Sequence, residues 1–227
     1  MSFANNGSAK LRAMLSKFAS VGLAFVIASA VSIAHADPPK EKYYFELKAI
    51  TPKPELKPEA VKTATPRVLA EIKKAFEHHP QIVAQLEGAP DPKVDPDAYR
   101  AYLDKAHITG AYKVTVEIMD AVETLAPMAD KPGAQRFEIR LALRMLGAHI
   151  PDDTLGFTGH GKANVTQEVG AKVPERDRQE TWGQVSELAV SKAIETALEE
   201  LTLAAKVKVK PKQKPKPVIK AAPAAPH

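Results

Sequence analysis

The chain has 227 residues, and its 44% hydrophobic and 26% charged residues are proportions typical of a globular protein. It has no cysteine, which excludes a disulfide framework and the lipid-modified cysteine of bacterial lipoproteins. The net charge of +5 is unevenly spread, because residues 1–36 carry +3, residues 205–227 carry seven lysines and no acid, and residues 37–204 carry −5.

The first 36 residues have the three-part pattern of a secretory signal peptide. Basic residues come first, an apolar run follows at 21–33, and small residues close the segment at Ala34-His35-Ala36. The run is shorter than the about 20 apolar residues that typically span a bilayer. We therefore expect cleavage between Ala36 and Asp37, no transmembrane anchor in the mature chain, and an exported protein, periplasmic or secreted, with no nucleic-acid partner.

The spacing of apolar residues predicts the first half of the body. Residues 43–50 alternate as a strand, and the proline-rich residues 51–66 predict an exposed connection. Thr65 is expected to cap a helix whose first residue is Pro66. A short strand at 82–86 follows.

The second half begins with a helix that Asp95 and Pro96 open. The alternation of apolar and polar residues then returns in three long strands. They begin near residues 110, 137 and 155, and we expect them to form an antiparallel meander. A last helix is expected from near Arg178. The prediction is a single α+β domain at 37–204, with the order β-α-β-α-β-β-β-α, a mixed sheet and about three packed helices, followed by a tail at 205–227.

Several of these segments resemble a small fold of bacterial envelope proteins. The resemblance lies in Leu69-Ala70-Glu71-Ile72, the 82–86 strand, the 108–114 entry into the meander and the 191–198 helix. This fold is shared by the amino-terminal domain of TolB, by CsgG and by the lipoprotein activators of penicillin-binding proteins. The resemblance implies a binding or assembly component of the envelope rather than an enzyme. The chain departs from the activators in lacking their lipoprotein cysteine and in having its proline-rich linker at the carboxyl end.

A glycine-rich stretch from Gly156 to Lys162 matches the first seven positions of a phosphate-binding P-loop. The match then fails, because Ala163 stands where the motif needs a hydroxyl for magnesium, and a strand rather than a helix is expected to follow. We expect no nucleotide or other cofactor there. The glycines are better explained by a strand that makes room for an overlying helix or a bulge.

Four possible metal ligands, His149, Asp152, Asp153 and His160, flank one predicted hairpin. Their types suit zinc or manganese, but they lack a helical spacing, and we assign no metal site. Trp182 lies on the apolar stripe of the last helix and is expected in the core. The chain contains no recognisable catalytic constellation.

The tail is rich in lysine, proline and alanine and cannot bury apolar area, so we expect it to be extended. It either serves as a spacer or contacts an anionic envelope polymer or lipid surface through Lys206, Lys208, Lys210, Lys212, Lys214, Lys216 and Lys220. The sequence thus favours an exported, non-enzymatic binding or assembly component of the cell envelope, whose partner is an envelope protein or an anionic polymer. Two alternatives stay open: an exported hydrolase or metal-dependent enzyme that uses the His149 to His160 hairpin, and a polyanion-binding protein that acts through its tail.

Overall fold

Five strands form one mixed sheet in the computed structural model, which describes residues 41–208. The strands are β1 (Lys42–Pro52), β2 (Ile82–Val83), β3 (Ile108–Pro127), β4 (Gln135–His149) and β5 (Leu155–Val169). They lie in the order β2-β1-β3-β4-β5, with β1 parallel to both of its neighbours. Strands β3, β4 and β5 pair antiparallel, as the sequence predicted for the meander.

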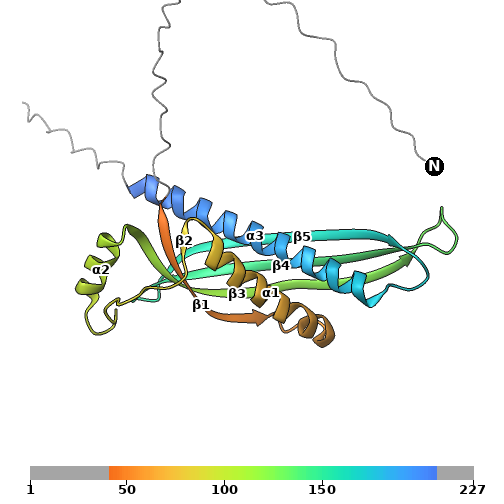
Figure 1. Cartoon of the computed structure of the whole chain (residues 1–227), viewed down its shortest axis with the longest axis horizontal. Coiled ribbons are helices and arrows are strands. Elements are labelled where there is room, and N and C mark those ends of the chain that lie inside the picture. The colour runs from red at the N-terminus through yellow and green to blue at the C-terminus, as the bar shows by residue number, and fades with distance from the viewer. Residues whose placement is uncertain (1–40, 209–227) are drawn as a thin grey trace, which may run out of the picture. The chain divides into compact units, whose positions relative to one another are not determined.

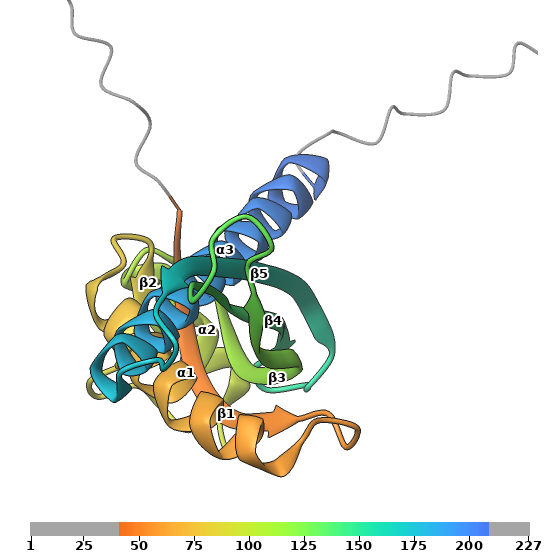
Figure 2. The ribbon, with the colours of Figure 1, turned by 90° about the vertical axis from the view of Figure 1, so that its right-hand side faces the viewer.

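Three helices complete the fold: α1 (Pro58–His78), α2 (Pro96–Lys105) and α3 (Glu175–Lys208). Figure 1 shows α1 and α3 side by side over one face of the sheet, with α2 at one end. Figure 2 shows the sheet curling around the side that carries the two long helices. The predicted α+β class and the order β-α-β-α-β-β-β-α are confirmed.

The main core lies between the helices and the sheet, because alternate residues of the central strands point to the helical side. Val114 and Val116 of β3 and Ile139 and Leu141 of β4 are all fully buried there. A smaller cluster around Tyr99 lies under α2. Helix α2 begins as predicted, since the Asp95 side chain accepts a hydrogen bond from the Ala98 amide at 2.9 Å.

Helix α1 begins eight residues earlier than the sequence predicted. Pro58, not Pro66, takes the first-turn position, Lys57 is the N-cap, and Pro66 lies inside the helix. The prediction that residues 51–66 form an exposed connection was therefore wrong at residues 51–52, which belong to β1, and from Pro58 onward. An interior proline removes one backbone hydrogen bond, but the early start lets Ala64 join the buried stripe of α1. Burial of this apolar face stabilises the helix by more than the interior proline destabilises it.

The remaining boundaries differ in smaller ways. The predicted 82–86 strand pairs only at Ile82 and Val83, and Leu155, the first residue of β5, is 66% exposed. Helix α3 begins at Glu175 and extends to Lys208, four residues into the segment predicted as tail. Among residues 41–208, the helices are too short or too polar to cross a bilayer.

The glycines of β5 make room for α3, as the sequence predicted. A Cβ atom on Gly159 would lie 2.3 Å from the carbonyl oxygen of Ala193, and one on Gly161 would lie 1.8 Å from that of Ala189. No side chain fits at such distances, so the helix backbone lies directly against the strand. Strand β5 continues to Val169 without turning into a helix, which removes the structural context of a P-loop.

Helix α3 also covers the outer edge of β5, whose unpaired backbone groups would otherwise be open to another strand. The amide of Thr158 donates to Glu200 Oε2 at 2.8 Å. The amide of His160 donates to Thr196 Oγ1 at 2.7 Å, and the same hydroxyl lies 3.0 Å from the His160 carbonyl oxygen. The last helix therefore acts as a substitute for a sixth strand along this edge.

Candidate binding site

A groove runs between the carboxyl-terminal half of α1 and the middle of α3, and we call it the α1–α3 groove. It consists of one cavity of about 500 Å³ and a second of about 440 Å³. The two cavities share His79 and Glu195 in their linings, so they are parts of one depression. The second cavity reaches Leu203, close to the end of α3.

The floor of the groove is an apolar stripe of α3. Val190, Ile194 and Leu198 follow one another four residues apart, a spacing that places them on the same side of a helix. They are only 2%, 2% and 6% exposed. Leu203, which lies five residues beyond Leu198 and off this side of the helix, also lines the second cavity and is 63% exposed. The groove therefore has a buried apolar floor and an exposed leucine toward the carboxyl end of α3.

The rim of the groove is acidic. Glu71, Glu187, Glu195 and Glu199 line it, against a single lysine, Lys74. Lys74 Nζ lies 3.3 Å from Glu71 Oε2 and 3.9 Å from Glu187 Oε1, so it offsets only part of the negative charge.

Glu195 forms an ion pair with a residue outside the lining of the groove. Lys192 Nζ lies 3.0 Å from Glu195 Oε2, and this hydrogen bond raises the pKa of Lys192. The rim therefore keeps an excess of carboxylates over ammonium groups near Glu199.

The end of α1 closes one side of the groove with two histidines. His78 Nδ1 lies 2.7 Å from the Lys74 carbonyl oxygen, and the His79 amide donates to the Ala75 carbonyl oxygen at 2.9 Å. His79 Nδ1 accepts from the Gln81 amide at 3.3 Å. A histidine near a helix carboxyl end interacts favourably with the exposed carbonyl groups.

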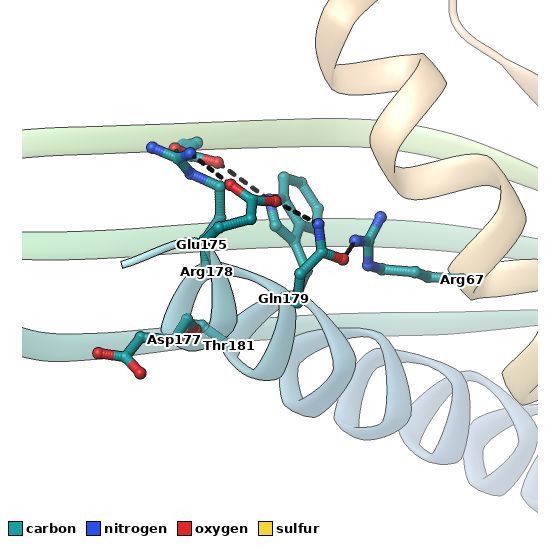
Figure 3. Close-up of polar contacts among 8 residues, drawn as sticks. Arg67, Glu175, Asp177, Arg178, Gln179 and Thr181 are labelled. Carbon is teal, nitrogen blue, oxygen red and sulfur yellow. Dashed lines mark hydrogen bonds and ion pairs between the residues drawn. The ribbon is translucent and has the colours of Figure 1, made fainter. Parts of the chain in front are cut away.

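A polar cluster lies at the opposite end of α3 and joins three elements (Figure 3). Glu123 of β3 accepts from the Trp182 indole Nε1 at 3.0 Å and from Arg178 Nε at 2.9 Å. Arg178 Nη1 also donates to Glu175 Oε2 at 2.9 Å. Gln179 connects Glu175 to Arg67 of α1.

The charges in this cluster stabilise one another. Hydrogen bonds from Gln179 and Arg178 lower the pKa of Glu175, and the bond to Glu175 raises the pKa of Arg178. Both carboxylate oxygens of Glu123 are already hydrogen-bonded. The arrangement therefore anchors the first turns of α3 to β3 and α1 rather than presenting a free acid or base to a substrate.

A β-bulge at Met119 brings Glu123 to this position. Ile118 pairs with Leu143 while Asp120 pairs with Ala142, so β3 has one extra residue at the bulge. The side-chain alternation is reversed beyond that point. Glu123 consequently faces the helices instead of the open side. The only sequence signal was the broken alternation between Ile118 and Ala121, and it was missed.

The structure does not bring the four hairpin residues together. The His149 ring lies against Tyr112, with centroids 4.6 Å apart. Asp153 Oδ1 pairs with Lys113 Nζ at 3.0 Å, which lowers the pKa of Asp153, whereas Asp152 accepts from Thr154. Within residues 41–208, no three histidine or acidic side chains are placed to hold a metal ion.

The other residues singled out from the sequence are distributed as follows. Trp182 is 1% exposed, which confirms its expected place in the core. Ala36, Asp37 and the lysines from Lys210 onward lie outside the described residues, so the expected cleavage site and tail contacts stay predictions. Lys206 and Lys208 lie in the last turn of α3.

No family model and no curated protein sequence matches the chain. Solved structures that are similar to it include a homolog of neuraminyllactose-binding hemagglutinin from Helicobacter pylori, with 13% identity, a TM-score of 0.43, and coverage of 78% of this chain and 94% of that one. A protein described as a lipoprotein from Caulobacter crescentus has 14% identity, a TM-score of 0.38, and coverage of 72% and 91%. Lipoprotein B from Nitrosomonas europaea has 10% identity, a TM-score of 0.32, and coverage of 75% and 89%.

These neighbours, two of which are described as lipoproteins, match this chain at low identity. They are not the TolB, CsgG or activator families that the sequence resembles, and that resemblance stays a prediction. TM-scores below 0.5 describe a partial likeness in the arrangement of elements.

Proposed function

We propose that this protein is an exported, non-enzymatic binding component of the cell envelope and that the α1–α3 groove is its contact surface for a protein partner. The observation that carries the proposal is the groove itself, a depression between two helices with a buried apolar floor and an acidic rim. Interfaces combine an apolar centre with a polar rim, and the floor at Ile194 with the rim at Glu187 and Glu199 has this composition.

The shape of the groove favours a peptide segment over a small molecule. Its two parts follow α3 from Glu187 to Leu203, which is about 24 Å at 1.5 Å per residue. Small-molecule sites surround most of their ligand, whereas this depression is long and open along its length. An extended or helical segment with basic residues would match the acidic rim.

The export pattern at residues 1–36 and the lysine-rich tail support the location and a second contact. We propose that the tail adds an electrostatic attachment to an anionic envelope polymer or membrane surface. The groove would then supply specificity, while the tail would raise the local concentration of the domain at the envelope.

Site-specific photocrosslinking in cells that export the protein tests this proposal. A photoreactive residue at Ser191, on the groove rim, is compared with one at Lys162, an exposed residue on β5 outside the groove. We expect a discrete crosslink to an envelope protein from Ser191 but not from Lys162, and its loss when Ile194→Asp disrupts the floor. The same crosslinks from both positions, or none from Ser191, would contradict the proposed contact surface.

The enzyme alternative has its own test. The purified exported protein is analysed for bound metal and assayed for hydrolysis after substitution of His149 and His160 by alanine. Because His149 packs against Tyr112 and His160 pairs with Arg144, five positions along β4 from His149, we expect no stoichiometric metal and no activity that depends on them. A bound metal lost in the double variant would restore the alternative.

A further inference from the structure

We propose that the α1–α3 groove is the docking site for the chain's own lysine-rich carboxyl-terminal segment, residues 209–227, so that the protein covers its binding surface until a partner displaces the segment. This goes beyond the proposed function, because it concerns a contact within the chain itself, in the absence of any partner. Three features carry it: charge complementarity, the position where the segment leaves the domain, and its length.

The charges of the two surfaces are opposite. Four glutamates line the groove, and Lys74 and Lys192 offset part of their charge, which leaves an excess of carboxylates. The segment from 209 contains five lysines and no acidic residue. Opposite net charges at this density attract over about 8 Å at physiological ionic strength, so the segment is drawn toward the groove rather than away from it.

The composition of the segment also suits the groove. Lys210, Lys212, Lys214 and Lys216 alternate with Val209, Pro211, Gln213, Pro215 and Pro217. A polyproline chain has three residues per turn, so the prolines and lysines are distributed around it rather than on one side. Prolines can therefore contact the exposed Leu203, while the long lysine side chains reach the glutamates of the rim.

The segment begins close enough to the groove, and is long enough, to extend along its whole length. The groove reaches Leu203, five residues before the end of α3 at Lys208. Returning from Lys208 to the level of Glu187 covers about 32 Å along the helix, at 1.5 Å per residue. An extended chain covers that distance in about 10 residues, at roughly 3.1 Å each, and 19 residues follow Lys208.

Tethering makes a weak interaction sufficient. Exposed ion pairs contribute only about 0 to 1 kcal/mol each, so the free segment would bind poorly as a separate peptide. A short flexible connection raises its effective concentration to the order of millimolar. The contact is therefore expected to be reversible, sensitive to salt and easily displaced by a basic segment of a partner.

Disulfide trapping in the purified exported chain tests the proposal, and the absence of native cysteine makes the introduced pair unambiguous. The reporting pair is Ser191→Cys with Val218→Cys, because Ser191 lies about 26 Å from Lys208 along the helix and the ten residues from Lys208 to Val218 cover about 31 Å. The control pair is Lys162→Cys with Val218→Cys. Lys162 is a matched position, because its neighbour Gly161 lies against Ala189 of α3 and so at nearly the same distance from the start of the tail.

We expect the reporting pair to form an intramolecular disulfide about tenfold faster than the control pair at low salt. The difference should disappear in about 0.5 M salt, where the screening length falls to roughly 4 Å. It should also disappear in Glu195→Lys/Glu199→Lys but persist in Glu77→Lys/Glu180→Lys, which changes the net charge equally outside the groove.

Equal rates for the two pairs would overturn the proposal. So would a disulfide-linked dimer as the main product of the reporting pair, because the groove would then hold the segment of a second copy. Circular dichroism of each variant establishes that the fold is retained. Failure here leaves the crosslinking test of the envelope contact unaffected, since no partner is present.

Discussion

At the residue scale, Glu123 and the β5 glycines show how single positions fix the long helix. Gly159 and Gly161 let the backbone of α3 lie directly against β5, and Glu123 fixes its first turns through Trp182 and Arg178. The two contacts lie at different levels along α3. Together they define how the helix lies on the sheet, and hence where the α1–α3 groove opens.

Gly161→Ala should destabilise the fold. The added Cβ would lie 1.8 Å from the Ala189 carbonyl oxygen, and a backbone atom cannot move aside without shifting the helix. We expect a loss of about 1 to 3 kcal/mol, as for other overpacked sites, measured by urea denaturation. Gly183→Ala is the control: it lies in α3 with nothing near the new Cβ and should stabilise by about 0.5 to 1 kcal/mol.

Glu123→Ala should also destabilise the fold, because the buried Trp182 indole N–H loses its acceptor. The cost of such an unpaired donor is about 1 to 3 kcal/mol. Denaturation followed by fluorescence of Trp182, the only tryptophan, measures it. Glu138→Ala removes a carboxylate that lies 3.9 Å from Arg140 on the partly exposed surface, and it should change stability by less than about 0.5 kcal/mol. Equal effects would show that the Glu123 contact is not specific.

At the scale of elements, α3 takes over the pairing that a neighbouring strand would provide to β5. Thr196 and Glu200 bond the outward amides of His160 and Thr158, so the strand is not available to another chain along this part. The opposite edge of the sheet is protected in another way. Its edge strand, β2, pairs with β1 at two residues only, so it offers few free backbone groups to another chain.

Thr196→Val should expose this edge. The substitution keeps the shape of the side chain but removes the hydroxyl that bonds the His160 amide. We expect a loss of about 1 to 2 kcal/mol and faster hydrogen exchange at the His160 amide. Thr166→Val, the same change at an exposed position of β5, should leave both quantities nearly unchanged. Unchanged exchange in Thr196→Val would mean that the helix covers the edge without this bond.

At the scale of the whole molecule, the chain combines an acidic domain with basic ends. Residues 37–204 carry −5, whereas the predicted signal segment and tail carry +3 and +7. The tail's charges can therefore act on the domain's own groove or on an external anionic surface. Competition between the two is the physical basis of the covered and open states that we propose.

Cleavage is expected between Ala36 and Asp37, because the small residues at 34 and 36 fit the peptidase preference. Mass spectrometry of the exported protein should find Asp37 as its first residue. Ala36→Leu should block this cleavage, while Ala30→Leu, inside the apolar run, should not. A mature membrane-bound product that begins at Met1 would contradict the prediction.

Removing residues 209–227 should leave the fold intact but weaken attachment to anionic surfaces. Thermal unfolding should change little, because the segment has no periodic apolar face. Each lysine near such a surface contributes about 1 kcal/mol. Co-sedimentation with anionic vesicles across a salt series should therefore show binding by the full chain at low salt only. Equal, salt-independent binding by both forms would assign the contact to the domain.

The sequence determined what depends on local periodicity. The alternation of β3 to β5, the Asp95 cap and the crowded glycines of β5 each rest on neighbouring residues, and the structure bears them out. It did not locate the start of α1, since Pro58 and Pro66 both satisfy the same first-turn preference. Nor did it place Glu123, whose orientation depends on the pairing register of β3 with β4.

The α1–α3 groove was decided by the tertiary structure alone. Glu71 and Glu195 are 124 positions apart in the chain, and nothing near either of them indicates that they line one depression. Their approach follows from the packing of α1 and α3 on one face of the sheet, which the close contact of α3 with Gly159 and Gly161 fixes. Local patterns report the periodicity of one element, whereas a groove between elements depends on how their buried faces fit together.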